Sequence, residues 1–288
     1  MTIFNCCELR SFPTQVIRRR PKVLGSLPAF PGEMNMISDQ YVWFAWSLVF
    51  LLLWGIIFAA LPGERRKMWQ TSFFTMPFGL TEPLFVPRYW SPPSLFNLAE
   101  RTGFDIESFI FCFAIGGASA VLYDLLTGRR SMRMTSAERH LPLHRHHVLA
   151  LISPVIAFLV LVFLPWNPIY PGVIAMAVGA IATMLCRPDL KARTWVGGIL
   201  FLIYYSTLLE GLRFSSPGYI ERVWNLPALV GTTLFGLPIE ELLFAAAFGM
   251  YWSGVYEHLT WRSVAPTAYE AVASSNRNMT SNTPRPSR

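Results

Sequence analysis

The sequence predicts an all-α integral membrane protein with about seven (6–7) transmembrane helices, arranged as two parallel three-helix repeats and one linking helix. Three observations lead to this fold class: the composition, the long apolar segments and an internal repeat. Of the 288 residues, 53% are apolar and only 14% are charged, whereas soluble domains carry roughly 25% charged residues. The composition therefore excludes an ordinary soluble domain, a disordered chain and a disulfide-stapled secreted module.

Seven segments are apolar enough to cross a bilayer, which takes about 20 mainly apolar residues. The second segment is interrupted by two prolines and a glycine, and the last by Gly236 and Pro238. Such interruptions need neighbouring helices or a cavity to satisfy the freed backbone groups, so the count is six if the second segment is re-entrant. The predicted spans are 41–61, 69–86, 104–126, 148–165, 169–186, 195–213 and 227–257.

The basic residues predict the orientation of these spans. Eleven Lys and Arg residues follow the first, third and fifth spans, whereas three follow the second, fourth and sixth. Because cytoplasmic loops carry the excess of basic residues, we expect a multi-pass protein of the cell (plasma) membrane with its N-terminus outside and its C-terminus in the cytoplasm. The net charge of +7 then reflects the basic residues that orient the protein in the membrane, and nucleic acid is not an expected partner.

The chain divides into five expected regions. Residues 1–36 form a basic leader that the orientation would leave outside, so we expect translation to begin at Met34 or Met36, or the leader to be disordered. The tail is rich in Ser, Asn, Thr and Pro, a composition typical of disorder. The other regions are a first three-helix repeat at 37–130, a basic cytoplasmic loop with the linking helix at 131–168, a second repeat at 169–258 and a disordered cytoplasmic tail at 259–288.

An internal repeat relates the two outer groups of helices. Residues 106–111 align with residues 239–244 at an offset of 133, which brings Glu107 into register with Glu240. A single linking helix makes both repeats run the same way through the membrane, related by an axis along the membrane normal. Further matched pairs are Ala114 with Ala247, Gly116 with Gly249, Tyr123 with Tyr256, Asp124 with Glu257 and Trp90 with Trp224.

Glutamates within or at the edge of the spans are the candidate catalytic residues. An ionisable group at the membrane centre costs at least about 2.5 kcal/mol and marks a functional site. Glu240 and Glu241 are the best candidates, because we expect their helix to begin near Pro227, more than two turns earlier. A buried, crowded carboxyl group is held protonated and acts as a general acid in a dry site. The candidates, all expected toward the outer leaflet, are Glu82, Glu107, Glu210, Glu240 and Glu241.

Aromatic residues follow four of these glutamates at helical spacing, which brings the side chains onto one helix face. An aromatic face beside an acid stabilises a developing cation by about 2 kcal/mol or more when desolvated. Ordinary helix packing, and glutamates solvated at the membrane interface, are the alternative interpretations. The pairs are Glu82 with Phe85, Glu107 with Phe111, Glu210 with Phe214 and Glu240 with Phe244.

The sequence Pro238-Ile239-Glu240-Glu241 resembles the Pro-x-Glu-(Glu/Asp) motif of the membrane-integral lycopene cyclase domain, found in heterodimeric bacterial cyclases and in fused archaeal and fungal ones. Residues 77–87, followed by Tyr89-Trp90, are also similar to members of that family. The resemblance covers residues 41–258, and family members carry two related three-helix units. The first repeat departs from the motif, because Asp105 and Ser108 stand where the second has Pro238 and Glu241.

The resemblance implies a lycopene β-cyclase type of enzyme, an intramolecular lyase or isomerase. Its reaction is a non-redox, acid-catalysed cyclisation of the ψ-end groups of lycopene to β-rings. It implies Glu240 or Glu241 as the acid and the other, or Glu107, as the base, with Glu82 and Glu210 as further catalytic candidates. The implied substrate-binding residues are Pro238, Phe85, Trp90, Phe111, Phe244 and Trp224.

The expected partners are the lipid bilayer, a linear lycopene-like carotenoid and other enzymes of carotenoid biosynthesis. No cofactor is expected, because the sequence lacks a GxGxxG or P-loop motif that would hold the flavin of soluble-type cyclases. Two alternative functions remain beside the cyclase. One is a proton-coupled carrier or carotenoid-binding membrane protein that uses the same glutamates. The other is a carotenoid hydratase that adds water to the same cation.

No metal site is expected either. The loop histidines are interpreted as part of a loop that orients the protein, because Arg139 and Arg145 would repel a metal cation. Cys112 and Cys186 are interpreted as buried thiols without a Cys/His pairing nearby. The histidines of this loop are His140, His144, His146 and His147.

Overall fold

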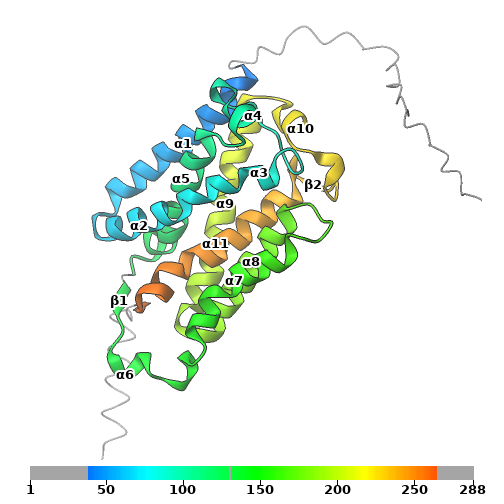
Figure 1. The fold of residues 1–288 in the computed structure, drawn as a ribbon. Helices are drawn as coiled ribbons and strands as arrows, with labels where there is room; N and C mark the ends of the chain where they lie inside the picture. Colours follow the sequence, from blue (N-terminus) through cyan, green and yellow to red (C-terminus); the bar gives the residue numbers. More distant parts are fainter. Residues whose placement is uncertain (1–37, 130, 265–288) are drawn as a thin grey trace, which may run out of the picture. The chain divides into compact units, whose positions relative to one another are not determined.

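The computed structural model describes residues 38–129 and 131–264, so the expected leader and most of the expected tail lie outside the described residues. The described chain is mostly helical, with two short antiparallel strand pairs and no closed sheet, and this confirms the helical fold class (Figure 1). The helices are α1 (Asp39–Ala60), α2 (Arg65–Thr75), α3 (Glu82–Phe85), α4 (Leu98–Thr102), α5 (Ile106–Thr127), α6 (Ser136–Arg139), α7 (His147–Leu161), α8 (Ile169–Cys186), α9 (Lys191–Ser215), α10 (Tyr219–Val223) and α11 (Ile239–Thr260). The strand pairs are β1 (Ser131–Arg133) with β4 (Arg262–Val264), and β2 (Thr233–Leu234) with β3 (Leu237–Pro238).

Five helical segments of the described chain are long and apolar enough to cross a membrane. They coincide with the predicted first, third, fourth, fifth and sixth spans. The predicted second span is helical throughout, because a 3₁₀ segment at Met76–Thr81 joins α2 to α3 despite its prolines. That segment and α11 do not meet the same criteria, so the count of six or seven stays a prediction. The five segments are Asp39–Ala60, Ile106–Thr127, Pro142–Leu161, Ile169–Cys186 and Pro188–Ser215.

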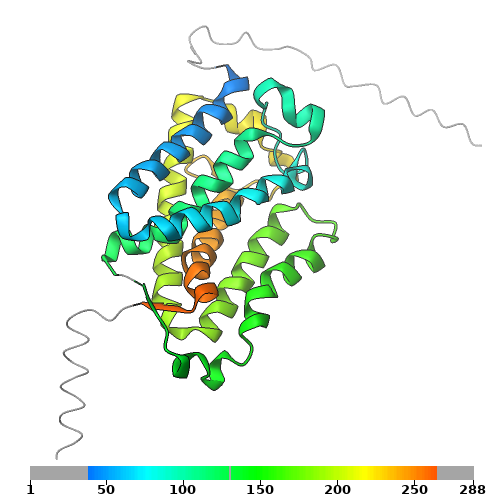
Figure 2. The ribbon, with the colours of Figure 1, turned by 60° about the vertical axis from the view of Figure 1, so that its left-hand side comes forward.

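Helix α11 is the most enclosed helix in the second half of the described chain, since it packs against α9, α8 and α5 (Figure 2). Small residues allow the close approach of its backbone, as in many membrane helix pairs. A Cβ atom at Gly249 would lie 2.8 Å from the carbonyl oxygen of Gly197 on α9. Other helices surround much of α11, and a helix enclosed by protein can carry polar groups such as glutamates.

The start of α11 differs from the prediction of a helix over 227–257. The chain before α11 forms a short 3₁₀ turn at Leu226–Ala228 and then the β2–β3 hairpin. Phe235 and Gly236 adopt φ values of +55° and +79° in that hairpin, and Pro238, which lacks an N–H, stands at the N-cap. The two glutamates of the motif therefore lie in the first turn of α11, and the expectation of two preceding turns is wrong.

At the end of the bundle where α5 and α11 begin, the loops after α3 and α10 meet (Figure 1). Trp90 and Trp224 form an isolated antiparallel bridge there, and the N–H of Ser91 donates to the carbonyl oxygen of Val223 at 2.8 Å. The sequence alignment of the repeats pairs these same two tryptophans. The bridge joins segments more than 130 residues apart and covers the starts of both helices.

At the opposite end, four buried charged side chains form a network that we call the ion-pair network. Lys67 of α2 contacts Asp124 of α5 and lies 2.7 Å from a carboxylate oxygen of Glu257 on α11. Arg193 of α9 contacts Asp124 and lies 3.3 Å from Glu257. All four are at most 3% exposed, and charges this deeply buried persist in proteins only when they are paired.

The predicted disordered tail begins too early. Residues 259–264 are structured, because α11 continues to Thr260 and Arg262–Val264 forms strand β4 against β1. This pairing ties the loop after α5 to the end of α11.

Candidate active site

The carboxyl group of Glu241 is buried at the start of α11, with 4% of the residue exposed. Its Oε1 accepts hydrogen bonds from the hydroxyl group of Tyr89 and, at 2.6 Å, from the indole N–H of Trp224. Its Oε2 accepts from the hydroxyl group of Tyr205 at 2.7 Å. The donors come from the loop after α3, the segment after α10 and helix α9, so one carboxyl group joins both predicted repeats.

These donors fit an ionised carboxylate. A carboxylate accepts on both oxygens, whereas a protonated acid needs an acceptor for its own O–H. The partners of Glu241 on both oxygens are donors. Burial, followed by the nearby Glu241, raises the pKa of the Tyr89 hydroxyl well above its usual range, so Tyr89 keeps the proton that it donates.

Glu240 has a different pattern of contacts, although it neighbours Glu241 in the chain and is 1% exposed. Its Oε1 accepts from the hydroxyl group of Tyr170 on α8 at 2.7 Å and from the backbone N–H of Val230 at 2.9 Å. Its Oε2 is buried and has no hydrogen-bond partner within the described chain. Two donors hold Oε1, so Oε2 is the oxygen left to exchange a proton with a bound molecule. We call these two glutamates and their four side-chain donors the Glu241 cluster.

Aromatic rings surround the Glu241 cluster, and the five rings predicted to bind substrate are each in contact with a neighbouring ring. Trp90 packs on Trp224, a donor to Glu241, and Phe111 and Phe244 both contact Tyr205. The centroid separations are 5.4 Å for Trp90–Trp224, 6.2 Å for Phe111–Tyr205, 5.7 Å for Tyr205–Phe244 and 6.4 Å for Phe85–Tyr89.

Pro238, the remaining predicted substrate-binding residue, is buried one residue before α11 and pairs with Thr233 in the hairpin. Because proline fixes its φ angle and lacks an N–H, it ends the hairpin and starts the helix at one defined residue. Pro238 therefore sets the residue at which α11 begins, and with it the positions of the two glutamates.

A second group of carboxyl groups, the Glu82 cluster, lies at the start of α5 and comprises Glu82, Asp105, Glu107 and Ser108. The hydroxyl group of Ser108 donates to Glu82 Oε2 at 3.1 Å, while Glu82 Oε1 is buried without a partner among the described residues. Glu107 accepts from the backbone N–H of Leu95 at 2.6 Å, and Asp105 caps α5. Burial raises the pKa of the Asp105 carboxyl group above its usual range.

The structure joins Glu210 to neither cluster. Glu210 lies one turn from Arg213 on α9 and forms an ion pair with it at 2.8 Å, where both side chains are partly exposed. Phe214, its expected aromatic neighbour, is 75% exposed. A pair at i,i+3 on the surface of a helix satisfies the charge of Glu210 locally, without a partner from another helix.

Three tyrosines of the Glu241 cluster were missed by the sequence reasoning. Tyr205 is a hydroxyl-bearing residue in the middle of an apolar helix, which was a usable signal, because a buried hydroxyl group needs a partner. Tyr89 lies next to Trp90 in a stretch that was noted for its resemblance to a family. Tyr170 carried no signal, because its role depends on a contact between α8 and the start of α11.

The fold and this site define a helical protein with a multi-pass membrane architecture and a buried carboxylate cluster enclosed by aromatic rings. The family model described as lycopene cyclase matches residues 167–259, which run from the start of α8 to the end of α11. The resemblance stated from the sequence is thereby confirmed for this segment, which is similar to the lycopene cyclase domain family. No curated protein and no solved structure shows a significant match to the chain.

Proposed function

We propose that this protein is a lycopene β-cyclase, which closes the ψ-end groups of a linear lycopene-like carotene into β-rings without net oxidation or reduction. The family match of the second half supports a carotenoid cyclase. The observation that carries the proposal is the buried Glu241 carboxyl group, which accepts three side-chain hydrogen bonds amid aromatic rings. That environment suits a short-lived carbocation.

In the proposed reaction Glu240 is the general acid. Its Oε2–H adds a proton to the terminal double bond of the carotene, and this leaves a tertiary carbocation. The neighbouring double bond attacks the cation, and the new carbon–carbon bond closes a six-membered ring. A proton then leaves the carbon beside the new cation, which restores a double bond, so the product is an isomer of the substrate. Burial of Glu240 keeps water from competing for the cation.

Glu241 is the proposed anion that stabilises the cation and then accepts the departing proton. Transfer of that proton from Glu241 to the neighbouring Glu240 restores both groups for the next turnover. Its donors fix both carboxylate oxygens, so little reorganisation is needed when positive charge develops. The rings of Trp90, Phe111 and Phe244 offer faces to the same charge, and cation–π attraction is about 2 kcal/mol or more in a desolvated site.

We further propose that the two halves are parallel repeats that cross the membrane together with one linking helix, seven spans in all. Two features support this arrangement. The Trp90–Trp224 bridge and the ion-pair network each bring together residues that the repeat alignment pairs or that occupy matching helices. The positive-inside rule then puts the Glu241 cluster toward the outer leaflet of the plasma membrane and the C-terminus in the cytoplasm.

Expression in a lycopene-accumulating bacterium tests the function. The pigments are separated by liquid chromatography, and their molecular masses are measured by mass spectrometry. The protein is quantified in the membrane fraction. We expect a product with the mass of lycopene and an absorption shifted to shorter wavelength, because the double bond within a β-ring is twisted out of the plane of the polyene and conjugates less well with it. Glu240→Gln and Glu241→Gln should abolish it, while Glu210→Gln, the matched control, should retain it.

Two outcomes would contradict the proposal. Unchanged lycopene, with the protein present in the membrane, would favour the carrier or pigment-binding alternative. A product heavier than lycopene by one water would show a hydratase, in which water and not a base consumes the cation.

A further inference from the structure

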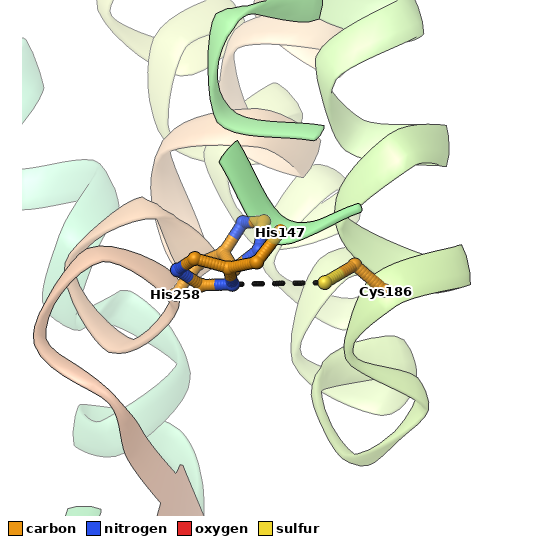
Figure 3. Close-up of side chains that lie close together, drawn as sticks. All are labelled: His147, Cys186 and His258. Atoms are coloured by element: carbon orange, nitrogen blue, oxygen red, sulfur yellow. Dashed lines mark hydrogen bonds between the residues drawn. The ribbon is translucent and has the colours of Figure 1, made fainter. Parts of the chain in front are cut away.

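At the end of α11 remote from the glutamates, two histidines and a cysteine meet, and we call them the His–Cys cluster (Figure 3). They are His147 at the start of α7, Cys186 at the end of α8 and His258 in the last turn of α11. The sequence interpretation that Cys186 has no histidine nearby is wrong. Its histidines lie 39 and 72 positions away in the chain, where no local spacing motif can reveal them.

The spacing of the donor atoms is that of ligands on one metal ion. In a tetrahedral zinc site with Zn–S near 2.3 Å and Zn–N near 2.1 Å, a sulfur and a nitrogen ligand lie about 3.6 Å apart. Cys186 Sγ is 3.6 Å from His147 Nδ1, and one donor atom from each of the three residues lies within 4.8 Å of the others. All three residues are at most 9% exposed.

His258 provides a second, independent indication of a ligand. The residue is 1% exposed, and its Nε2 has no hydrogen-bond partner anywhere in the described chain. Its other ring nitrogen, Nδ1, lies 3.1 Å from the hydroxyl oxygen of Thr183 on α8. Metal-binding histidines commonly show this division, in which one nitrogen is held by a neighbouring group and the other binds the ion.

The surroundings of the cluster also suit a cation. The buried cation beside it, Arg187, is neutralised by Asp189 at 2.7 and 2.9 Å, and it also donates to the backbone oxygen of Arg262 at 2.5 Å. The ring of His147 stacks on Trp261 with a centroid separation of 3.8 Å, which fixes the direction of its Nδ1. Of the two arginines expected to repel a metal ion, Arg145 is exposed and Arg139 is half-buried.

We propose that His147, Cys186 and His258 bind a zinc ion. The ion would join the start of α7 to the ends of α8 and α11. The donor set of one thiolate and two imidazoles is one that zinc prefers, and burial suits a structural ion. His144 Nδ1 lies 3.8 Å from the same sulfur and is the side chain within reach of the fourth position. Glu240 and His258 are 18 residues apart on one helix, roughly 27 Å, so the ion takes no part in the proposed cyclisation.

Metal analysis of the purified protein tests the proposal without any measurement of activity. The full chain is purified in detergent with a tag that contains no histidine, and Cys6 and Cys7 are replaced by serine because they are the other thiols near the N-terminus. Inductively coupled plasma mass spectrometry should find about one zinc per chain. Cys186→Ser and His258→Gln should lose it, whereas the controls Cys112→Ser and His146→Ala should keep it, since Cys112 is at the other end of the bundle and His146 is exposed.

A measurement on the unaltered cluster guards against variants that fail to fold. After treatment with a chelator, Co²⁺ should give the visible absorption bands of a tetrahedral, thiolate-bound ion, and Zn²⁺ should bleach them and slow alkylation of Cys186. A chelated protein that gives neither the bands nor the protection would overturn the proposal. So would equal metal content in the cluster variants and the wild type. Because none of these readouts depends on carotene, failure of the cyclase proposal would leave the result intact.

Discussion

The starts of α5 and α11 align in sequence, yet they present their carboxyl groups in different ways. In the Glu241 cluster, three side-chain donors hold both oxygens of one carboxylate. At the aligned position α5 has Ser108, whose hydroxyl group donates to the carboxyl group of Glu82 from α3 at 3.1 Å. The aligned starts of the two helices therefore differ, because α11 carries a carboxyl group with donors on both oxygens, whereas α5 carries a serine that donates to a carboxyl group with one unpaired oxygen.

This difference indicates which role each half has in the proposed reaction. A carboxylate with preorganised donors stabilises positive charge without reorganisation, whereas a carboxyl group with one free oxygen is held neutral by burial or needs another partner. Glu240 and Glu82 share the second pattern. We expect the second half to carry the reaction and the first half to complete the enclosure, chiefly by lending Tyr89 to Glu241.

The largest expected effect is on the carboxylate itself. Glu241→Gln replaces one accepting oxygen by an amide N–H₂, which faces its donors with another donor. We expect the rate of cyclisation to fall about 10²- to 10⁴-fold, the range for loss of a general acid or base. Initial rates of pigment formation in isolated membranes, normalised to protein, check this. If the variant retained more than a tenth of the wild-type rate, the proposed role of Glu241 would be wrong, and the Glu82 cluster would become the better candidate for the catalytic site.

The next largest effect is on stability, and it tests whether the cations of the two halves contribute equally to the ion-pair network. Lys67→Met leaves two buried carboxylates without one of their cations, and Arg193→Met does the same from the other half. Each should lower the free energy of unfolding by about 3 to 5 kcal/mol, the cost of breaking a buried pair. Thermal unfolding in detergent measures this loss, and removal of the partly exposed Asp39–Arg222 pair should cost at most about 1 kcal/mol. Unequal losses for the two network variants would mean that one half dominates the network.

A smaller effect is expected from single donors. Tyr205→Phe removes one of three hydrogen bonds to Glu241, and the rate should fall about ten- to hundredfold, as for a hydrogen bond to a charged group. Tyr204→Phe is the matched control, because the neighbouring hydroxyl group has no partner in the part of the chain that the structure describes. Equal rates for the two variants would show that the donors of Glu241 are dispensable.

The smallest effect is expected in the first half. Glu82→Gln keeps the bond from Ser108 on an oxygen and removes no group that transfers a proton, so the rate should stay within about threefold of wild type. The same pigment assay serves, with Ser108→Ala as the companion variant. A loss as large as that of Glu241→Gln would mean that both halves are catalytic.

The sequence was sufficient for features that depend on local pattern. Apolar length predicts most of the helices, and the charge of Glu240 and Glu241 in an apolar segment marks the site. Helical spacing also predicts that Phe111 and Phe244 lie on the same side of their helices as the site. These are properties of single helices, which hydropathy and periodicity encode.

Contacts between distant segments could not be predicted in the same way. The start of α11 depends on a hairpin that two residues with positive φ make possible, and apolar residues within that hairpin imitate a continuing helix. The isolation of Glu210 depends on which face of α9 turns away from the site, and Arg213 is the partner there. The meeting of Cys186 with His258 requires the ends of α8 and α11 to lie together, which no spacing in the chain reports.

The ion-pair network has a consequence for how such a protein could be assembled. Each half contributes one cation and one anion, so each half is balanced alone, yet each cation also touches the anion of the other half. A slip of one helical turn, about 5.4 Å, would separate every contact between the halves, so the network recognises a single register. Two separately synthesised chains with these four residues would find that register without a peptide link. The buried charges therefore add to the specificity that the β1–β4 pairing and the Trp90–Trp224 bridge give to the fit between the halves.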